Sequence, residues 1–173
     1  MRRTTPLILA LLLATSPAAH AASVYLSPDV PTTLGVTTYQ PTQVIRDDSG
    51  AHSLALTLPA GAAIDALFRR EDGRWLFSFD APVQLSATTY QPNDVVMYDG
   101  VTWSLFFYGS GMGIPASAGV DAVFMEGGDN GNIVVSLDVP AVIRGQLMEA
   151  TKFLHLQNHG VESPSNGKSL VMD

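Results

Sequence analysis

A five-residue segment, TTYQP, occurs twice in this chain, at residues 37–41 and 88–92, fifty-one residues apart. The similarity extends on both sides of the two copies. The aligned pairs are YLSPDVP (25–31) with LFSFDAP (76–82), and LPAGAAIDALF (58–68) with IPASAGVDAVF (114–124). Internal similarity at a period near fifty residues is typical of repeat architectures. The chain therefore builds its fold from a repeated unit.

A third copy of the unit begins near residue 131, where NIVVSLDVP (132–140) resembles RWLFSFDAP (74–82). We therefore divide the chain into units of about 24–73 and 74–130 and a partial unit, 131–173. Only the second unit carries an insertion, around GSGMG (109–113).

Turn dipeptides predict the secondary structure of each unit. Asp72-Gly73, Asp99-Gly100 and Asn130-Gly131 each join two runs rich in Val, Ile, Phe, Tyr or Trp. Asp-Gly and Asn-Gly between such runs are strong hairpin signals. Two hairpins per unit predict a four-stranded antiparallel meander and an all-β protein. The sheets are then propeller blades, or they form a stack or sandwich.

The number of units limits the architecture. A propeller closes with four or more blades, and this chain has two units and a fraction. It must fold as an open stack or sandwich, or complete itself as a homo-oligomer. The tail segment 145–160 leaves two alternatives. Its alignment with the repeat favours a strand, whereas its residue types allow a short C-terminal helix.

The repeat also resembles a known pattern. SFDAPVQL (78–85), TYQPNDVV (89–96), DGVTWSL (99–105) and IPASAGVDA (114–122) together resemble a propeller-like β repeat of secreted proteobacterial proteins. The resemblance implies export and an all-β repeat fold. It implies no catalytic residue. The first copy departs from the pattern at residues 47–50, which read DDSG.

The first 21 residues are predicted to be a secretory signal peptide. Arg2 and Arg3 precede an apolar run, 7–14, and Ala19-His20-Ala21 forms an A-x-A cleavage site. The run is too short to span a bilayer. From their number we expect residues 22–173 to form a single domain, with no membrane insertion once the signal is removed. The chain has no cysteine, which fits a secreted or periplasmic bacterial protein.

Charge restricts the partners of the mature chain. Loss of Arg2 and Arg3 leaves seven basic and sixteen acidic residues, a net charge of −9. Such a chain is repelled by nucleic acid and by anionic membrane surfaces. A protein or a carbohydrate remains as the expected ligand.

Aspartates recur at fixed places in the units. The repeated positions are Asp29, Asp80 and Asp138, then Asp65 and Asp121, then Asp48 and Asp99. Aspartates at strand ends accept backbone N–H bonds and shape turns. Because a residue found in every unit usually serves the unit's shape, we interpret these as structural, with a cation site as the alternative.

Three further segments could carry chemistry. EGGDNGN (126–132) places oxygen ligands close together and gives weak candidates for calcium, namely Glu126, Asp129, Asn130 and Asn132. A hairpin turn is the other interpretation. His155 and His159 could share a zinc ion on a helix, although no third ligand is evident. GSGMG lacks the spacing of a phosphate loop or a nucleophile elbow and is predicted to be a flexible loop.

The sequence thus favours a secreted, non-catalytic β-repeat protein that binds a ligand or has a structural role in the bacterial envelope. No catalytic or cofactor-binding residue is predicted. One alternative is a calcium-dependent adhesion or matrix component. A secreted hydrolase is the second, but no nucleophile, base and orienting group can be assembled for it.

Cleavage at the A-x-A site predicts a mature chain that starts at Ala22, because signal peptidase cuts after small residues. Amino-terminal sequencing of the exported protein tests this. Exported material that retains Met1 would contradict it.

Overall fold

The structure is a computed structural model that describes residues 23–129, 131–150, 152–156 and 170–172. Strands predominate, as the sequence predicts, and α1 (Gly109–Met112) is the only helix among these residues. No helix within them is long and apolar enough to cross a membrane. The predicted signal peptide, 1–21, lies outside the described residues.

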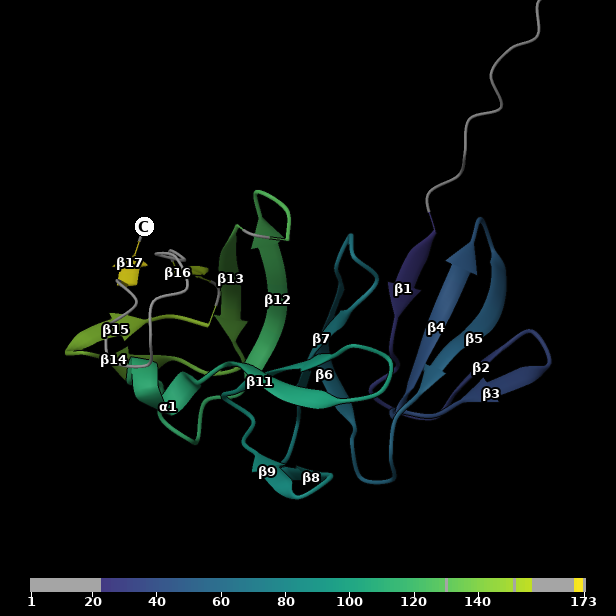
Figure 1. Cartoon of the computed structure of the whole chain (residues 1–173), viewed down its shortest axis with the longest axis horizontal. Coiled ribbons are helices and arrows are strands. Elements are labelled where there is room, and N and C mark those ends of the chain that lie inside the picture. Colours follow the sequence, from purple (N-terminus) through teal and green to yellow (C-terminus); the bar gives the residue numbers. More distant parts are fainter. Residues whose placement is uncertain (1–22, 130, 151, 157–169, 173) are drawn as a thin grey trace, which may run out of the picture.

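The strands form three antiparallel sheets that lie side by side (Figure 1). The first sheet contains β1 (Val24–Leu26), β4 (Gln43–Asp48) and β5 (Ala51–Thr57). The middle sheet contains β6 (Ile64–Arg69), β7 (Trp75–Phe79), β10 (Val95–Tyr98) and β11 (Trp103–Phe107). The last sheet contains β12 (Val120–Glu126), β13 (Asn132–Leu137), β16 (Leu154–Leu156) and β17 (Leu170–Met172).

Each sheet also carries a short two-stranded hairpin that the sequence analysis did not predict. These hairpins are β2 (Thr32–Leu34) with β3 (Thr37–Tyr39), β8 (Val83–Leu85) with β9 (Thr88–Tyr90), and β14 (Ala141–Ile143) with β15 (Gln146–Met148). Each turns at a residue with positive φ, namely Gly35, Ser86 or the pair Arg144 and Gly145. In the chain, the hairpins come directly after β1 in the first sheet, β7 in the middle sheet and β13 in the last sheet.

The three predicted hairpins of the meanders are present as β6–β7, β10–β11 and β12–β13. Asn130, in the third of these turns, lies outside the described residues. The boundaries of the sheets differ from those of the predicted repeat units. Hairpin β6–β7 crosses residue 73, so the middle sheet starts at β6, inside the first predicted unit.

The middle sheet is covered on both faces. Leu76 and Phe77 are neighbours on β7 and point to opposite faces, yet both are fully buried. Leu76 belongs to an apolar core shared with the last sheet, and Phe77 to one shared with the first sheet. Continuous apolar runs on strands are typical of such doubly covered sheets. The stack is therefore held by two separate cores.

The repeated tyrosine fills the same place in two hairpins. Tyr39 at the end of β3 and Tyr90 at the end of β9 are each only 4% exposed. Met148, at the corresponding end of β15, is 3% exposed. The prediction that both tyrosines lie over an apolar face is confirmed for Tyr90, which packs in the core between the first and middle sheets.

The proline of TTYQP joins successive sheets. The carbonyl of Pro41 accepts a hydrogen bond from the N–H of Ile64, which begins β6, at 3.0 Å. The carbonyl of Pro92 accepts one from Val120, which begins β12, also at 3.0 Å. Since each bond runs from one sheet to the first strand of the next, TTYQP is repeated because it forms the joint between units.

Two local predictions are corrected. The helix alternative for residues 145–160 is wrong over its described part, which forms β15 and β16. There Leu154 pairs with Val135 of β13, and this pairing outweighs helix propensity. The GSGMG segment was predicted to be a flexible loop, but it forms α1. Gly109 is required because a Cβ there would lie 1.9 Å from the carbonyl oxygen of Asn93.

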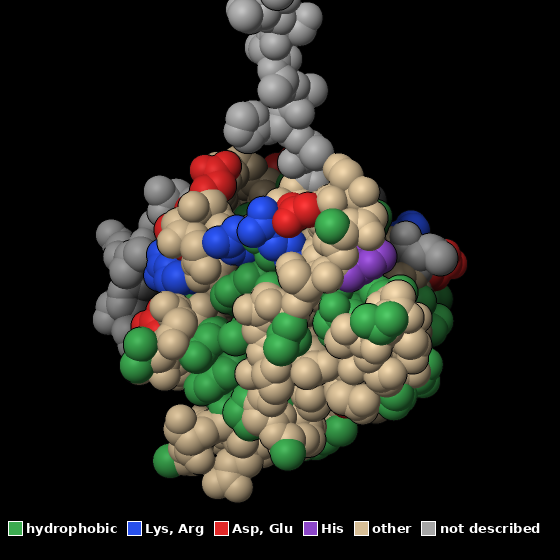
Figure 2. Space-filling view, turned by 90° about the vertical axis from the view of Figure 1, so that its right-hand side faces the viewer, with side chains coloured by type: hydrophobic (Ala, Val, Ile, Leu, Met, Phe, Trp, Pro, Cys, Tyr) green, Lys and Arg blue, Asp and Glu red, His purple; other side chains and the backbone are tan. Residues whose placement is uncertain are grey.

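The first sheet has a face that no described sheet covers. Figure 2 views the molecule from the β5 side and shows hydrophobic side chains in separate groups among polar atoms, with basic and acidic groups above them. Leu54 of β5 is half-exposed on this sheet. The stack is thus open at this end.

We expect Tyr39→Ala and Tyr90→Ala each to lower the free energy of unfolding by about 3–5 kcal/mol, because both rings are buried. The costs should add in the double variant, since the tyrosines belong to hairpins of different sheets. Tyr108→Ala is the control, because Tyr108 is 55% exposed, and should change stability by less than about 0.5 kcal/mol. Denaturant melts of the four variants and of the unaltered protein measure these free energies. An unchanged midpoint in both single variants would mean that TTYQP serves recognition.

Candidate functional site

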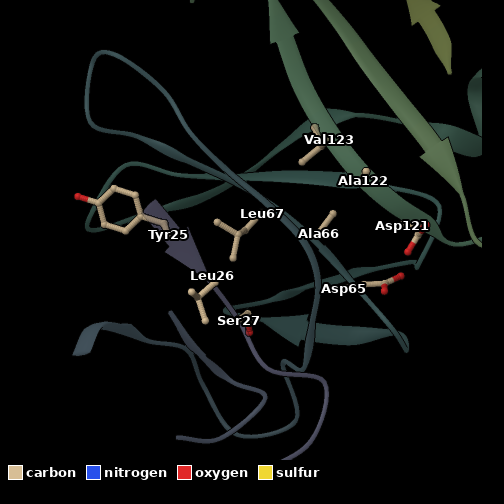
Figure 3. Close-up of a pocket in the computed structure, with 9 residues that line it drawn as sticks. All are labelled: Tyr25, Leu26, Ser27, Asp65, Ala66, Leu67, Asp121, Ala122 and Val123. Atoms are coloured by element: carbon tan, nitrogen blue, oxygen red, sulfur yellow. The ribbon is translucent and has the colours of Figure 1, made fainter. Parts of the chain in front are cut away.

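An open groove of about 290 Å³ lies where the first strands of the three sheets meet. It is lined by Tyr25 and Leu26 of β1 and the adjoining Ser27, by residues 65–67 of β6 and by residues 121–123 of β12. Figure 3 shows that side chains from all three strands surround this space. The groove therefore exists only because three segments separated by about forty to a hundred residues are stacked.

The local sequence aligns two of these strands. β6 begins Ile-Asp-Ala and β12 begins Val-Asp-Ala, and each has a register irregularity at this point against the next strand of its sheet. In the middle sheet the buried Ser78 hydroxyl accepts a hydrogen bond from Ala66 N–H at 2.9 Å. The same hydroxyl donates to the carbonyl of Val120 at 2.5 Å. One serine thus fixes β6 against β12.

The aromatic end of the groove joins the first and middle sheets directly. Tyr25 packs edge-on against Trp75, with ring centroids 5.0 Å apart. Arg69 donates a hydrogen bond to the Tyr25 hydroxyl at 2.8 Å, and its guanidinium lies 5.0 Å from the centre of the Tyr25 ring. Such stacked cations stabilise an exposed contact by about 0.5–1 kcal/mol. Sequence analysis did not single out Tyr25 or Arg69.

The other end of the groove is acidic. The pKa of Asp65 is raised to about 6, first by partial burial and then by the charges of Asp121, Asp138, Asp80 and Asp29, in that order of influence. A Cβ atom placed on Gly119 would lie within 4 Å of a carboxylate oxygen of Asp138 and of one of Asp65, so these two side chains face the same spot. The fold therefore gathers five of the repeated aspartates, from all three units, at one end of the groove.

The structural interpretation of the aspartates holds for several of them. Asp138 accepts a hydrogen bond from Gly119 N–H at 2.8 Å. Asp99 accepts bonds from the backbone N–H groups of Val101 and Thr102 and from the Thr102 hydroxyl, and these bonds lower its pKa to about 2. The pKa of Asp48 is lowered by a hydrogen bond from Ser23 and by Arg46.

The weak calcium candidates of the 126–132 segment are placed apart. Asp129 accepts hydrogen bonds from the N–H groups of Glu71 and Asp72 and lies 3.4 Å from the Arg70 guanidinium. Glu126 instead faces His155, with 3.5 Å between carboxylate oxygen and ring nitrogen. Asn132 begins β13, and Asn130 is outside the described residues. Across the described residues, no three His, Asp or Glu side chains are arranged to hold a metal ion.

The remaining candidate residues have structural neighbours. Ser110 of α1 accepts a hydrogen bond from the side-chain amide of Asn93 at 3.1 Å. His155 lies on β16, whereas His159 falls outside the described residues.

Comparisons of the chain with protein-family models, with curated proteins and with solved structures find no match.

The acidic end of the groove predicts an unusual pH dependence. Asp65 has a folded pKa of about 6, above its ordinary value of 3.8, so the folded state holds more protons between these values. The free energy of unfolding should therefore fall as pH rises from about 4 to 6. Asp65→Asn removes this loss, so its melting temperature should exceed that of the unaltered protein at pH 7 but not at pH 4.

Asp99→Asn provides a control of opposite sign. The pKa of Asp99 is lowered, so its contribution is present above about pH 4 and lost at lower pH. This variant should melt earlier than the unaltered protein at pH 7. A difference for Asp65→Asn that is equal at pH 4 and pH 7 would rule out this account of the groove.

Proposed function

We propose that the protein is an exported, non-catalytic β-repeat protein of the bacterial envelope that binds another protein through the groove between β1, β6 and β12. The observation that carries this proposal is the composition of the groove. Small and apolar side chains such as Ala66, Leu67 and Val123 line it beside a set of carboxylates. Apolar contact area next to fixed charges suits recognition of a polypeptide.

The hydrolase alternative finds less support. Ser27 is the serine that lines the groove, and its hydroxyl donates to the carbonyl of Pro41 at 3.3 Å and not to a basic side chain. The raised pKa of Asp65 resembles that of a general acid, but it follows from partial burial and then from nearby like charges at a repeated structural position. Structural clusters of carboxylates shift a pKa in the same way.

A calcium-dependent adhesion protein is the second candidate, because five aspartates lie near one another at the end of the groove, although no three described carboxylates are already arranged around one metal position. Calcium prefers oxygen ligands from several carboxylates. If calcium binds there, millimolar calcium should raise the melting temperature, and Asp65→Asn should abolish the rise. Under the first proposal calcium leaves the melting temperature unchanged.

The first proposal is tested by capture from a native envelope extract on the immobilised mature protein. Asp121→Lys reverses an exposed charge in the groove, and Glu71→Lys makes the same change on the exposed β6–β7 turn. We expect Asp121→Lys to lose at least 80% of a captured band and Glu71→Lys to retain it, since only the former alters the binding surface. Equal capture by both variants, or none by the unaltered protein, contradicts the proposal.

A further inference from the structure

The first sheet lacks a strand that the other two sheets have. In the middle sheet β7 pairs with β10 on one side and with β6 on the other. In the last sheet β13 likewise lies between β16 and β12. The corresponding strand β1 pairs with β4, and among the described residues no strand pairs with its other edge. This edge exposes a row of backbone groups that can pair with another chain.

The position that a further strand would occupy coincides with the groove. The groove is lined by β1 on one side and by β6 and β12 on the other. A strand paired with β1 would lie beside β6, just as β6 lies beside β12 in the stack (Figure 3). Space for the strand is therefore present next to the edge that would bind it.

Ser27 provides a second, independent sign of the missing strand. Ser78, at the same place in the middle sheet, accepts a hydrogen bond from Ala66 of the first strand and donates one across to Val120. Ser27 lines the groove and donates to Pro41, but no described N–H group donates to it. Its hydroxyl oxygen is thus positioned to accept the N–H of the third residue of an added strand.

Charge determines which strand fits best. β6 and β12 each carry aspartate as their second residue, and these residues already lie in a group of five carboxylates. A third strand with aspartate at this place would bring a sixth. Like charges side by side destabilise a sheet, whereas opposite charges stabilise it. A lysine or arginine at the second position therefore complements the acidic end of the groove.

We propose that the free edge of β1 accepts an extended strand from a partner polypeptide, antiparallel to β1. The strand carries apolar residues like those of β12, a small third residue, and a basic second residue. Main-chain hydrogen bonds supply affinity in this mode of recognition, and side-chain pockets supply specificity. Cleavage after Ala21, as predicted above, leaves only two residues before Val24, too few for a strand of the length of β6.

This inference rests on the proposed function and names the partner of the same groove. The probe is a synthetic heptapeptide with the sequence of β12 (Val120–Glu126) in which Lys replaces Asp121. Titration calorimetry with the mature protein should show binding at least tenfold tighter than for the peptide that retains aspartate. The ratio should shrink in 1 M salt, because salt screens the charge contribution. A scrambled peptide and a peptide N-methylated at alternate residues, on the edge that faces β1, should not bind.

Ser27→Ala tests the serine contact, and Ser53→Ala on the exposed strand β5 is the matched control. Loss of one hydrogen bond should weaken binding of the lysine peptide about five- to tenfold in the first variant and leave it unchanged in the second. Thermal melts of both variants establish that they are folded.

Three results would overturn the inference: no binding of the lysine peptide, undiminished binding of the N-methylated peptide, or equal affinity for the lysine and aspartate peptides. Its failure is distinguishable from failure of the proposed function. Groove-dependent capture from the envelope without peptide binding leaves a binding protein whose partner is not a strand. If the peptide binds but nothing is captured from the envelope, the free edge of β1 still accepts a strand, and the proposed envelope role is wrong.

Discussion

The middle sheet carries large apolar side chains on both faces, and the rest of the structure depends on covering them. Leu76 and Phe77 on β7, and Val95 and Val96 on β10, alternate between the faces and are all fully buried. Leaving one face in water would cost about 1.5–3 kcal/mol for each such side chain. The middle sheet must therefore have a neighbour on each side, which accounts for a stack of three sheets with two cores. The first sheet needs only one covered face, and the half-exposed Leu54 fits this difference.

A stack of this kind also needs a joint that sets the spacing of its sheets, and TTYQP supplies it. The turn that follows the tyrosine is closed by the bond from Gln43 N–H to the carbonyl of Gln40, and the second copy has the same bond between Asp94 and Gln91. The closed turn aims the proline carbonyl at the first N–H of the next sheet. Because proline has a fixed φ, this orientation needs little further ordering. The last sheet retains the turn, with Lys152 bonded to Glu149, although neither tyrosine nor proline is present. Turn geometry is thus kept where the sequence itself has diverged.

Much of the fold could be predicted because it is determined locally. Asp-Gly and Asn-Gly between apolar runs specify hairpins whatever lies around them. The burial of Tyr90 could be predicted because the same tyrosine occurs at the same place in two units. The beginning of each sheet could not be predicted, since a periodic sequence has no marked starting point. α1 was missed because its glycines suggest flexibility, whereas close approach of Gly109 to Asn93 is what requires glycine there. The groove escaped prediction for a different reason. Its residues are ordinary members of a repeat, and only the stacking of three distant strands brings them together.

In a repeat structure, equivalent residues differ in function according to their place in the stack. Ser78 and Ser27 occupy the same position of the unit, yet Ser78 is enclosed between two strands and Ser27 borders an open groove. Interior units use their hydrogen-bonding groups on one another, so contacts with neighbours account for their stability. At the end of the stack the outer edge of β1 pairs with no described strand, and its geometry is already fixed by the units behind it. A pre-organised surface of this kind loses little conformational entropy when a ligand binds. The end of the stack is therefore the place where a repeat protein can acquire a binding function without any new motif.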